Sequence, residues 1–142
     1  MQPGQGQPRE STAPAVIVHG ARDVALALEV AAGRPIALLS APGAPAYWGV
    51  AGFAALLAPH GAMPLGILDA AAAPGHALAA LRVGFTRVVL APHLPAFAAL
   101  EALAHGMGAS LLPTAPPALD LAAVDLRKPQ GRAHLAGWLN RR

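Results

Sequence analysis

The chain has 142 residues, of which 55% are hydrophobic and 12% are charged, and its formal net charge is +3. This length is typical of one domain, and the hydrophobic fraction is too high for an intrinsically disordered chain. Because there is no cysteine, the sequence excludes disulfides, thiolate metal sites and thiol nucleophiles.

The positive charge is concentrated near the C-terminus. Residues 127–142 carry five basic residues and no acid, whereas residues 15–126 carry four arginines and six acids. A nucleic-acid-binding domain usually has a basic face with aromatic side chains on its folded body. The slightly acidic body therefore argues against a nucleic-acid partner. We interpret residues 127–142 as a solubilising tail, with contact to an acidic partner or phosphate as the alternative.

Targeting and membrane signals are weak. Residues 1–14 are rich in Pro, Gly and Gln, lack the pattern of a secretory signal, and are predicted to be a disordered leader. Prolines divide the uncharged stretch 35–68, and its longest proline-free piece, residues 46–58, is shorter than the about 20 residues of a spanning helix. We therefore expect no membrane partner and a cytoplasmic protein. The richness in Ala, Gly, Pro and Arg is typical of a GC-rich bacterial genome.

Short apolar runs alternate with longer apolar stretches along the chain. The short runs are typical of buried parallel strands, and proline before or glycine after the longer stretches marks helix ends. In chain order, we expect strand 15–19, helix 22–32, strand 35–40, helix 46–58, strand 64–69, helix 75–83, strand 87–91, helix 95–105, strand 109–113 and a short final helix over 132–140.

Five strands alternating with four helices predict an α/β fold, with residues 15–126 as a single domain. Right-handed crossovers would then give a parallel sheet with helices on both faces, which is a three-layer α/β/α sandwich. The expected strand order is 2-1-3-4-5, the flavodoxin-like arrangement, and another Rossmann-like order is the alternative.

The predicted helix over residues 46–58 is apolar on all sides, whereas a surface helix usually has a polar face. A five-stranded sheet cannot bury such a helix completely, and its remaining apolar side would form a patch typical of interfaces. The alternative is that the C-terminal segment, with Trp138, covers this helix within one chain. We predict a twofold homodimer, with these residues at its interface: Tyr47, Trp48, Phe53 and Leu57.

Polar residues follow the predicted strands, at the edge where open parallel sheets bind ligands. In the order 2-1-3-4-5, His19 and Asp69 end neighbouring strands and flank the point where the strand order reverses. Helix N-termini at this edge offer backbone N–H groups to an anion. The other candidate ligand-binding residues of this edge are Gly20, Ser40, Gly43, Gly75, His76 and His93.

These candidates also have a purely structural interpretation. His19 can donate to a backbone carbonyl, and Asp69 and Ser40 can form hydrogen bonds within turns. There is no GxGxxG or GxxxxGK[ST] motif, so neither a nucleotide nor any other cofactor is expected. The six histidines lack ligand spacing, and we expect no metal site.

Three segments combine into a family resemblance. Val16-Ile17-Val18-His19-Gly20 carries a His-Gly pair at a strand end, Leu68-Asp69 precedes a small-residue turn with Pro74, and His93-Leu94-Pro95 opens a helix. These segments resemble mannose-type phosphotransferase-system IIA domains, in which the histidine of a strand-end His-Gly pair accepts phosphate. The family's Gly-Gly-Ser-Pro turn is replaced here by Ala-Ala-Ala-Pro. The resemblance implies His19 as phospho-acceptor, Asp69 as its orienting carboxylate, and a dimeric α/β architecture.

Three functions therefore stay open, and the sequence leaves undecided whether the protein is an enzyme. The first is an accessory module that binds a small anionic ligand or a partner protein, because the edge has Asp69 as its only acid and no lysine, whereas enzymes need a matched acid and base. The second is a histidine phosphotransfer domain using His19 and Asp69. The third is a small lyase or hydrolase with His19 as general base and Ser40 as candidate nucleophile.

Overall fold

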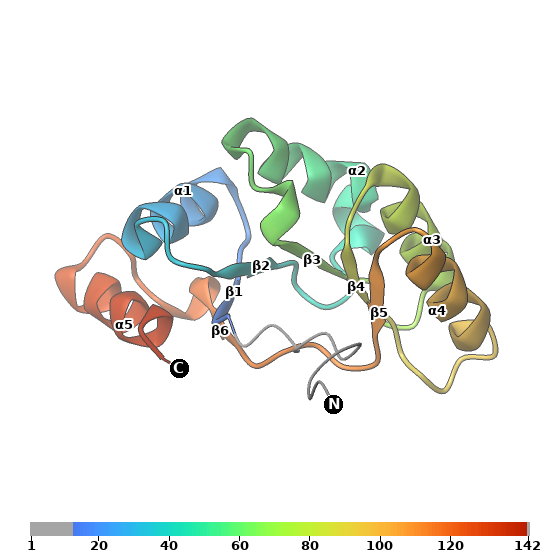
Figure 1. Ribbon diagram of the computed structural model, residues 1–142. Coiled ribbons are helices and arrows are strands. Elements are labelled where there is room, and N and C mark those ends of the chain that lie inside the picture. Colours follow the sequence, from blue (N-terminus) through green and yellow to red (C-terminus); the bar gives the residue numbers. More distant parts are fainter. Residues whose placement is uncertain (1–12, 142) are drawn as a thin grey trace, which may run out of the picture.

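The sheet consists of parallel strands in the order β5-β4-β3-β2-β1-β6 (Figure 1). The computed structural model describes residues 13–141, so the predicted leader lies outside the described residues except at its last two positions. The strands are β1 (Ala15–Ile17), β2 (Ala37–Leu39), β3 (Gly66–Asp69), β4 (Arg87–Val89), β5 (Ser110–Leu112) and β6 (Ala118–Asp120). The helices are α1 (Ala21–Ala31), α2 (Pro45–Leu57), α3 (Pro74–Val83), α4 (Phe97–Gly106) and α5 (Pro129–Leu139). Short 3-10 turns span Ala58–His60, Met63–Leu65 and Leu121–Ala123.

The predicted α/β fold with a parallel sheet is confirmed, but the predicted strand order 2-1-3-4-5 is wrong. From β1 to β5, each crossover moves one strand along in the same direction. A sixth strand, β6, then returns to pair in parallel with β1 on its other side. This strand was not expected, because its three residues follow Pro116-Pro117 and form no apolar run long enough to stand out.

The helices lie on one face of the sheet, so the fold has two layers where the sequence predicted three. Right-handed crossovers that all run in one direction place their helices on one face, and Figure 1 shows α1 to α4 arranged in this way. The helix α5 packs beside α1 and continues the same layer. The large hydrophobic core lies between this layer and the sheet.

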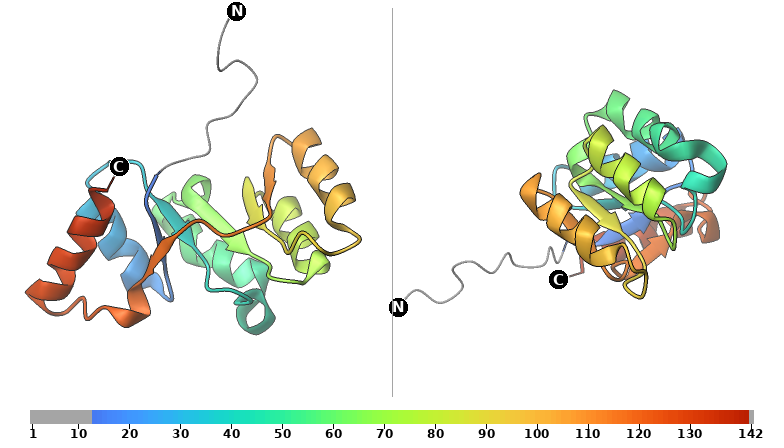
Figure 2. Two further views of the ribbon diagram at one scale, coloured as in Figure 1. Left: turned by 90° about the horizontal axis from the view of Figure 1, so that it is seen from below. Right: turned by 90° about the vertical axis from the view of Figure 1, so that its right-hand side faces the viewer.

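The other face of the sheet has no helix among the described residues. Its side chains alternate with those of the core and form a second apolar cluster that includes Leu39, Ile67 and Val89. The connection from β5 to β6, residues 113–117, crosses this face (Figure 2), and we call it the strap. Leu39 and Ile67 are each only 2% exposed. A parallel sheet is normally covered on both faces, and here a proline-rich segment contributes to the second cover.

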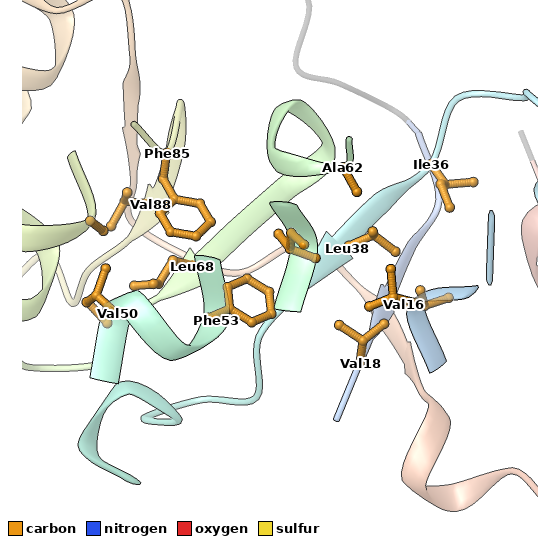
Figure 3. Packing of buried hydrophobic residues seen from close by; sticks show 14 of the residues in the cluster. Val16, Val18, Ile36, Leu38, Val50, Phe53, Ala62, Leu68, Phe85 and Val88 are labelled. Carbon is orange, nitrogen blue, oxygen red and sulfur yellow. The ribbon is translucent and has the colours of Figure 1, made fainter. Parts of the chain in front are cut away.

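The helix α2 is buried more deeply than the sequence suggested. Phe53 stacks on Phe85 with 5.7 Å between ring centroids, and both rings pack near Leu68 and Val88 (Figure 3). The predicted interface residues Phe53 and Leu57 are therefore core residues, at 1% and 0% exposure.

The start of α2 is irregular and exposed. Gly49 interrupts the helical backbone with φ 75° and ψ 160°, a conformation that favours glycine. Trp48, before this break, is 45% exposed, and the side chain of Tyr47 lies outside what the structure describes. No helix within residues 13–141 combines the length and the apolar character needed to cross a membrane.

The C-terminal segment belongs to the folded body. Leu135 and Leu139 on α5 are buried, and Trp138 Nε1 donates a 2.8 Å hydrogen bond to the carbonyl oxygen of Ala15 at the start of β1. Arg141 lies over the ring of Trp138, at 4.3 Å from its centroid. The expected short helix is thus present, and it packs on α1. The alternative in which the C-terminal segment covers α2 is wrong.

Gly66→Ala tests the packing between α2 and the sheet. A Cβ atom at Gly66 would lie 2.6 Å from Cδ1 of Leu57, 3.1 Å from Cε1 of Phe85 and 3.3 Å from the carbonyl oxygen of Met63. Because Leu57 is fully buried, it has little room to move, and we expect a loss of about 1–3 kcal/mol in the free energy of unfolding.

Urea denaturation measures this loss. The control is Gly137→Ala in α5, where an added Cβ meets nothing within 4 Å; it should leave the free energy of unfolding unchanged or raise it by up to about 1 kcal/mol. Equal stability of the Gly66→Ala variant and the native chain would contradict the described packing.

Candidate functional site

A histidine and an aspartate meet where the direction of the strand order changes. His19 follows β1, Asp120 ends β6, and Nε2 of His19 lies 2.6 Å from Oδ1 of Asp120. The chain leaves β1 toward β2 on one side and comes back as β6 on the other, and the register pairs Ile17 with Asp120. Ligands of open parallel sheets bind at the carboxyl ends of strands at such a point. The His19–Asp120 pair is therefore the candidate site.

Backbone hydrogen bonds hold both partners in place. The backbone N–H of His19 donates to Oδ2 of Asp23, 2.8 Å away in the first turn of α1, across the extended residue Gly20. The backbone N–H of Ala122 donates to Oδ1 of Asp120 at 2.9 Å, the same oxygen that meets His19. The backbone of His19 and the carboxylate of Asp120 are thus each held by the segment that follows its own strand.

The electrostatics of the pair favour an ionised carboxylate. Burial raises the pKa of Asp120, but the Ala122 N–H bond, together with the hydrogen bond and charge of His19, outweighs it and leaves the pKa below its ordinary value. An ionised carboxylate only accepts hydrogen bonds, so Nε2 of His19 carries the proton of this contact. In the neutral imidazole, Nδ1 then has the lone pair, which can accept a proton or attack an electrophile. The side chains of His19 and Asp120 are 35% and 47% exposed.

Asp69, the predicted partner of His19, lies elsewhere. The strand β2 separates β1 from β3, so the expectation that His19 and Asp69 end neighbouring strands is wrong. Oδ1 of Asp69 accepts from the backbone N–H of Ala71 at 2.8 Å, and the backbone N–H of Asp69 donates to Oγ of Ser40 at 2.8 Å. Asp69 and Ser40 are 5% and 1% exposed. Burial raises the pKa of Asp69, and the Ala71 N–H bond opposes this rise only in part. The bond from Ala71 to Asp69 is the turn hydrogen bond of the structural interpretation. Ser40 does not form the expected turn bond, because its hydroxyl oxygen accepts from Asp69 at the end of the neighbouring strand.

The other candidates do not join the pair. Gly20 is the N-cap of α1, Gly75 and His76 lie in the first turn of α3, and Gly43 lies in the turn before α2 with φ 71°. His93 is exposed after β4. No hydrogen bond among the described residues connects these five to His19 or Asp120. Within residues 13–141 there is also no group of three or more His, Asp or Glu side chains arranged to hold a metal ion.

Sequence reasoning missed Asp120, although a signal was present. Asp120 closes the segment Pro-Pro-Ala-Leu-Asp, just as Asp69 closes Pro-Leu-Gly-Ile-Leu-Asp. An acid at the end of an apolar run after proline marks a strand end in both places. The shorter run at residues 118–120 concealed the second case.

A shallow hollow lies beside the pair. It has a volume of about 200 Å³ and is formed by the start of α1 and the segment before α5, with Arg22, Asp23 and Leu26 facing residues 124–127. Neither His19 nor Asp120 is part of its wall. Small-molecule sites usually have about 300–1,000 Å³, so this hollow is small for an enclosed substrate.

No protein-family model matches the chain, and no curated protein matches it in sequence.

Replacing His19 should change the acidity of Asp120. His19 contributes a hydrogen bond and a charge that lower the pKa of Asp120, so His19→Ala should raise this pKa. A carbon-detected NMR titration of the Asp120 carboxyl group measures the change. His134→Ala, in an exposed position on α5, is the matched control and should have no effect. An unchanged Asp120 pKa in His19→Ala would mean that the two side chains are not in contact in solution.

Asp69 should make the folded protein less stable as the pH rises from acid to neutral. Because its pKa is raised in the folded state, its favourable contribution is present below about pH 3.9, the ordinary aspartate pKa, and is lost as the pH rises through the folded-state pKa. Asp69→Asn keeps an acceptor for Ala71 and cannot ionise. The free energy of unfolding of this variant, relative to the native chain, should therefore increase from acid to neutral pH. Urea denaturation at both pH values checks this, and a pH-independent difference would contradict the raised pKa.

Proposed function

We propose that the protein is a phosphoryl-carrier module in which Nδ1 of His19 accepts a phosphoryl group delivered by a partner protein. Asp120 holds the imidazole through Nε2 and balances the charge that develops on it. The observation that supports this proposal is the 2.6 Å contact between His19 and Asp120 at the point where the strand order reverses.

Exposure of the pair favours a macromolecular partner over a small substrate. His19 is 35% exposed, and the adjoining hollow is small and excludes it. An enzyme that uses a general base on a small molecule usually encloses its substrate and excludes water. A carrier histidine has to be exposed, because the phosphorylated side chain of a partner must reach it. The same exposure argues against the lyase or hydrolase hypothesis.

The transfer step follows from the hydrogen-bonding pattern of His19. The lone pair of Nδ1 attacks phosphorus, the bond between phosphorus and the donor's leaving atom breaks, and that electron pair leaves with the donor, which takes up a proton. The imidazole becomes cationic, with Nε2–H pointing at the Asp120 carboxylate. Such charge-assisted hydrogen bonds are about twice as strong as neutral ones, so Asp120 stabilises the phosphorylated state.

The role proposed for His19 agrees with the family resemblance, whereas the role of the carboxylate moves to another residue. His19 retains the role of phospho-acceptor that the His-Gly pair implied. Asp120 takes the role of orienting carboxylate that the resemblance assigned to Asp69, because Asp69 is buried and engaged with Ala71.

This chain exposes an apolar residue at the same edge of the sheet, where a partner protein could dock. Trp48 is 45% exposed at the start of α2, which follows the carboxyl end of β2 next to β1. Exposed tryptophans are frequent anchors of protein interfaces. We propose that Trp48 helps to dock the partner, which can be a second copy of this chain, as the homodimer hypothesis requires, or a separate donor protein.

Phosphoramidate, a small phosphorylating agent for histidine, tests the proposal on the full chain. The native protein should gain the mass of one phosphoryl group on His19, and the modification should be acid-labile. His19→Ala should lose it. Asp120→Asn should slow it by about ten-fold or more, the size of effect seen when the hydrogen-bonding partner of a metal-ligating histidine is removed. Intact-mass and tandem mass spectrometry measure the rate and the site.

Two matched variants separate a specific reaction from general histidine reactivity. Asp69→Asn and His134→Ala should be phosphorylated at the native rate. If His19 reacts no faster than the exposed His105 and His134, the carrier proposal fails, and the remaining hypothesis is a binding module without a covalent step.

A further inference from the structure

A second cavity lies on the helix-free face of the sheet, away from the His19–Asp120 pair. It has a volume of about 330 Å³, and the strap forms one wall. The opposite wall is the sheet, where Ala37, Ile67 and Arg87 are contributed by β2, β3 and β4. Figure 2 shows the strap crossing the sheet on this side. The lining is predominantly apolar, and Arg87 is its charged side chain.

Arg87 is half-buried without a carboxylate partner in the described part of the chain. It opens β4, and since Val88 faces the helices, alternation turns Arg87 toward the helix-free face together with Val89. One guanidinium nitrogen, Nη2, donates to the carbonyl oxygen of Leu65 at 3.2 Å. The ion pairs found among residues 13–141 involve Asp120 and Asp125 as acids, and neither includes Arg87.

The partial burial of the charged Arg87 side chain is energetically unfavourable unless an anion or further acceptors compensate it. Burial lowers its pKa below the ordinary value, yet a guanidinium keeps its charge in proteins. A half-buried cation with a single carbonyl partner leaves most of its five N–H donors for other acceptors. An anion in the cavity would compensate both the charge and these donors, and a planar carboxylate fits the donor fork of arginine.

We propose that this cavity binds a small organic monocarboxylate with an apolar body. Its carboxylate pairs with Arg87, and its hydrocarbon part lies between Ile67 and the prolines of the strap. The single positive charge matches a monoanion, and the volume is at the lower end of the range for small-molecule sites. This binding site is independent of the phosphoryl-carrier proposal.

A competing occupant belongs to the chain itself. Ala13 is part of the cavity wall, and residues 1–12, which precede it, include the acid Glu10. A chain that starts at Ala13 separates this possibility from an external ligand.

Titration calorimetry with sodium decanoate, kept below its micelle-forming concentration, tests the proposal on the full chain. The uncharged analogue decanol is the matched probe. The native protein should bind decanoate more tightly than decanol. Arg87→Gln should weaken decanoate binding by about ten-fold or more, the usual effect of losing a charge-assisted hydrogen bond, and should leave decanol binding unchanged.

Control variants make the result interpretable. Arg82→Gln removes an exposed arginine on the opposite layer, in α3, and should bind decanoate like the native chain. Arg87→Lys keeps the charge without the fork and should bind with intermediate affinity, and circular dichroism checks that each variant folds.

Three outcomes would overturn the proposal. One is the absence of decanoate binding to the native chain, and another is equal binding of decanoate and decanol to it. The third is binding only to the chain that starts at Ala13, which would identify residues 1–12 as the natural occupant.

Discussion

The pairing of β6 with β1 is the interaction on which the other features depend. This short ladder joins residues 118–120 to residues 15–17, and three consequences follow from it. Asp120 comes within hydrogen-bond distance of His19. The chain between β5 and β6 has to cross the sheet and becomes the strap. The helix α5 then begins beside α1 and closes the helical layer at that end.

The packing that stabilises this ladder lies outside the candidate site. A partly exposed histidine–aspartate contact contributes little to stability, since exposed ion pairs give about 0–1 kcal/mol. Burial of Leu121, Leu135 and Leu139 contributes far more, at about 1.5–3 kcal/mol for each fully buried leucine. Trp138 adds a hydrogen bond directly to the first residue of β1. The His19–Asp120 geometry is therefore imposed by the apolar packing around the β1–β6 ladder, which leaves the polar pair available for chemistry.

The sequence predicted local structure better than the arrangement of the strands. Apolar runs ending at glycine or proline located five strands and five helices to within a few residues, because each run reflects burial at its own position. The direction of each crossover has no local signature, and consistent right-handed crossovers gave one helical layer where two were expected. The sequence around Phe53 predicts a helix with an exposed apolar patch. In the structure α2 lies between α1 and α3, and the side that carries Phe53 is buried.

Of the two residues of the candidate site, the local sequence indicated His19 but not its partner Asp120. His19 stands out because it ends a clear β-branched run. Asp120 could not be paired with it without knowing that a three-residue strand returns to β1. Asp69 has the same local pattern as a functional strand-end acid, and only its burial and its bond to Ala71 distinguish it.

The return of β6 to β1 also makes the assembly of this sheet a late step during synthesis. His19 and Asp120 are 101 positions apart, and contacts of such separation form late because the intervening loop must first be closed. Until the ribosome has released residues 118–120, the nascent chain exposes the backbone edge of β1, and the apolar face of its sheet lacks the strap. Unpaired edges of this kind invite association with other chains. The strap and β6, residues 113–120, thus protect β1 and complete the histidine site in one event. A nascent chain that lacks these residues carries His19 without its carboxylate.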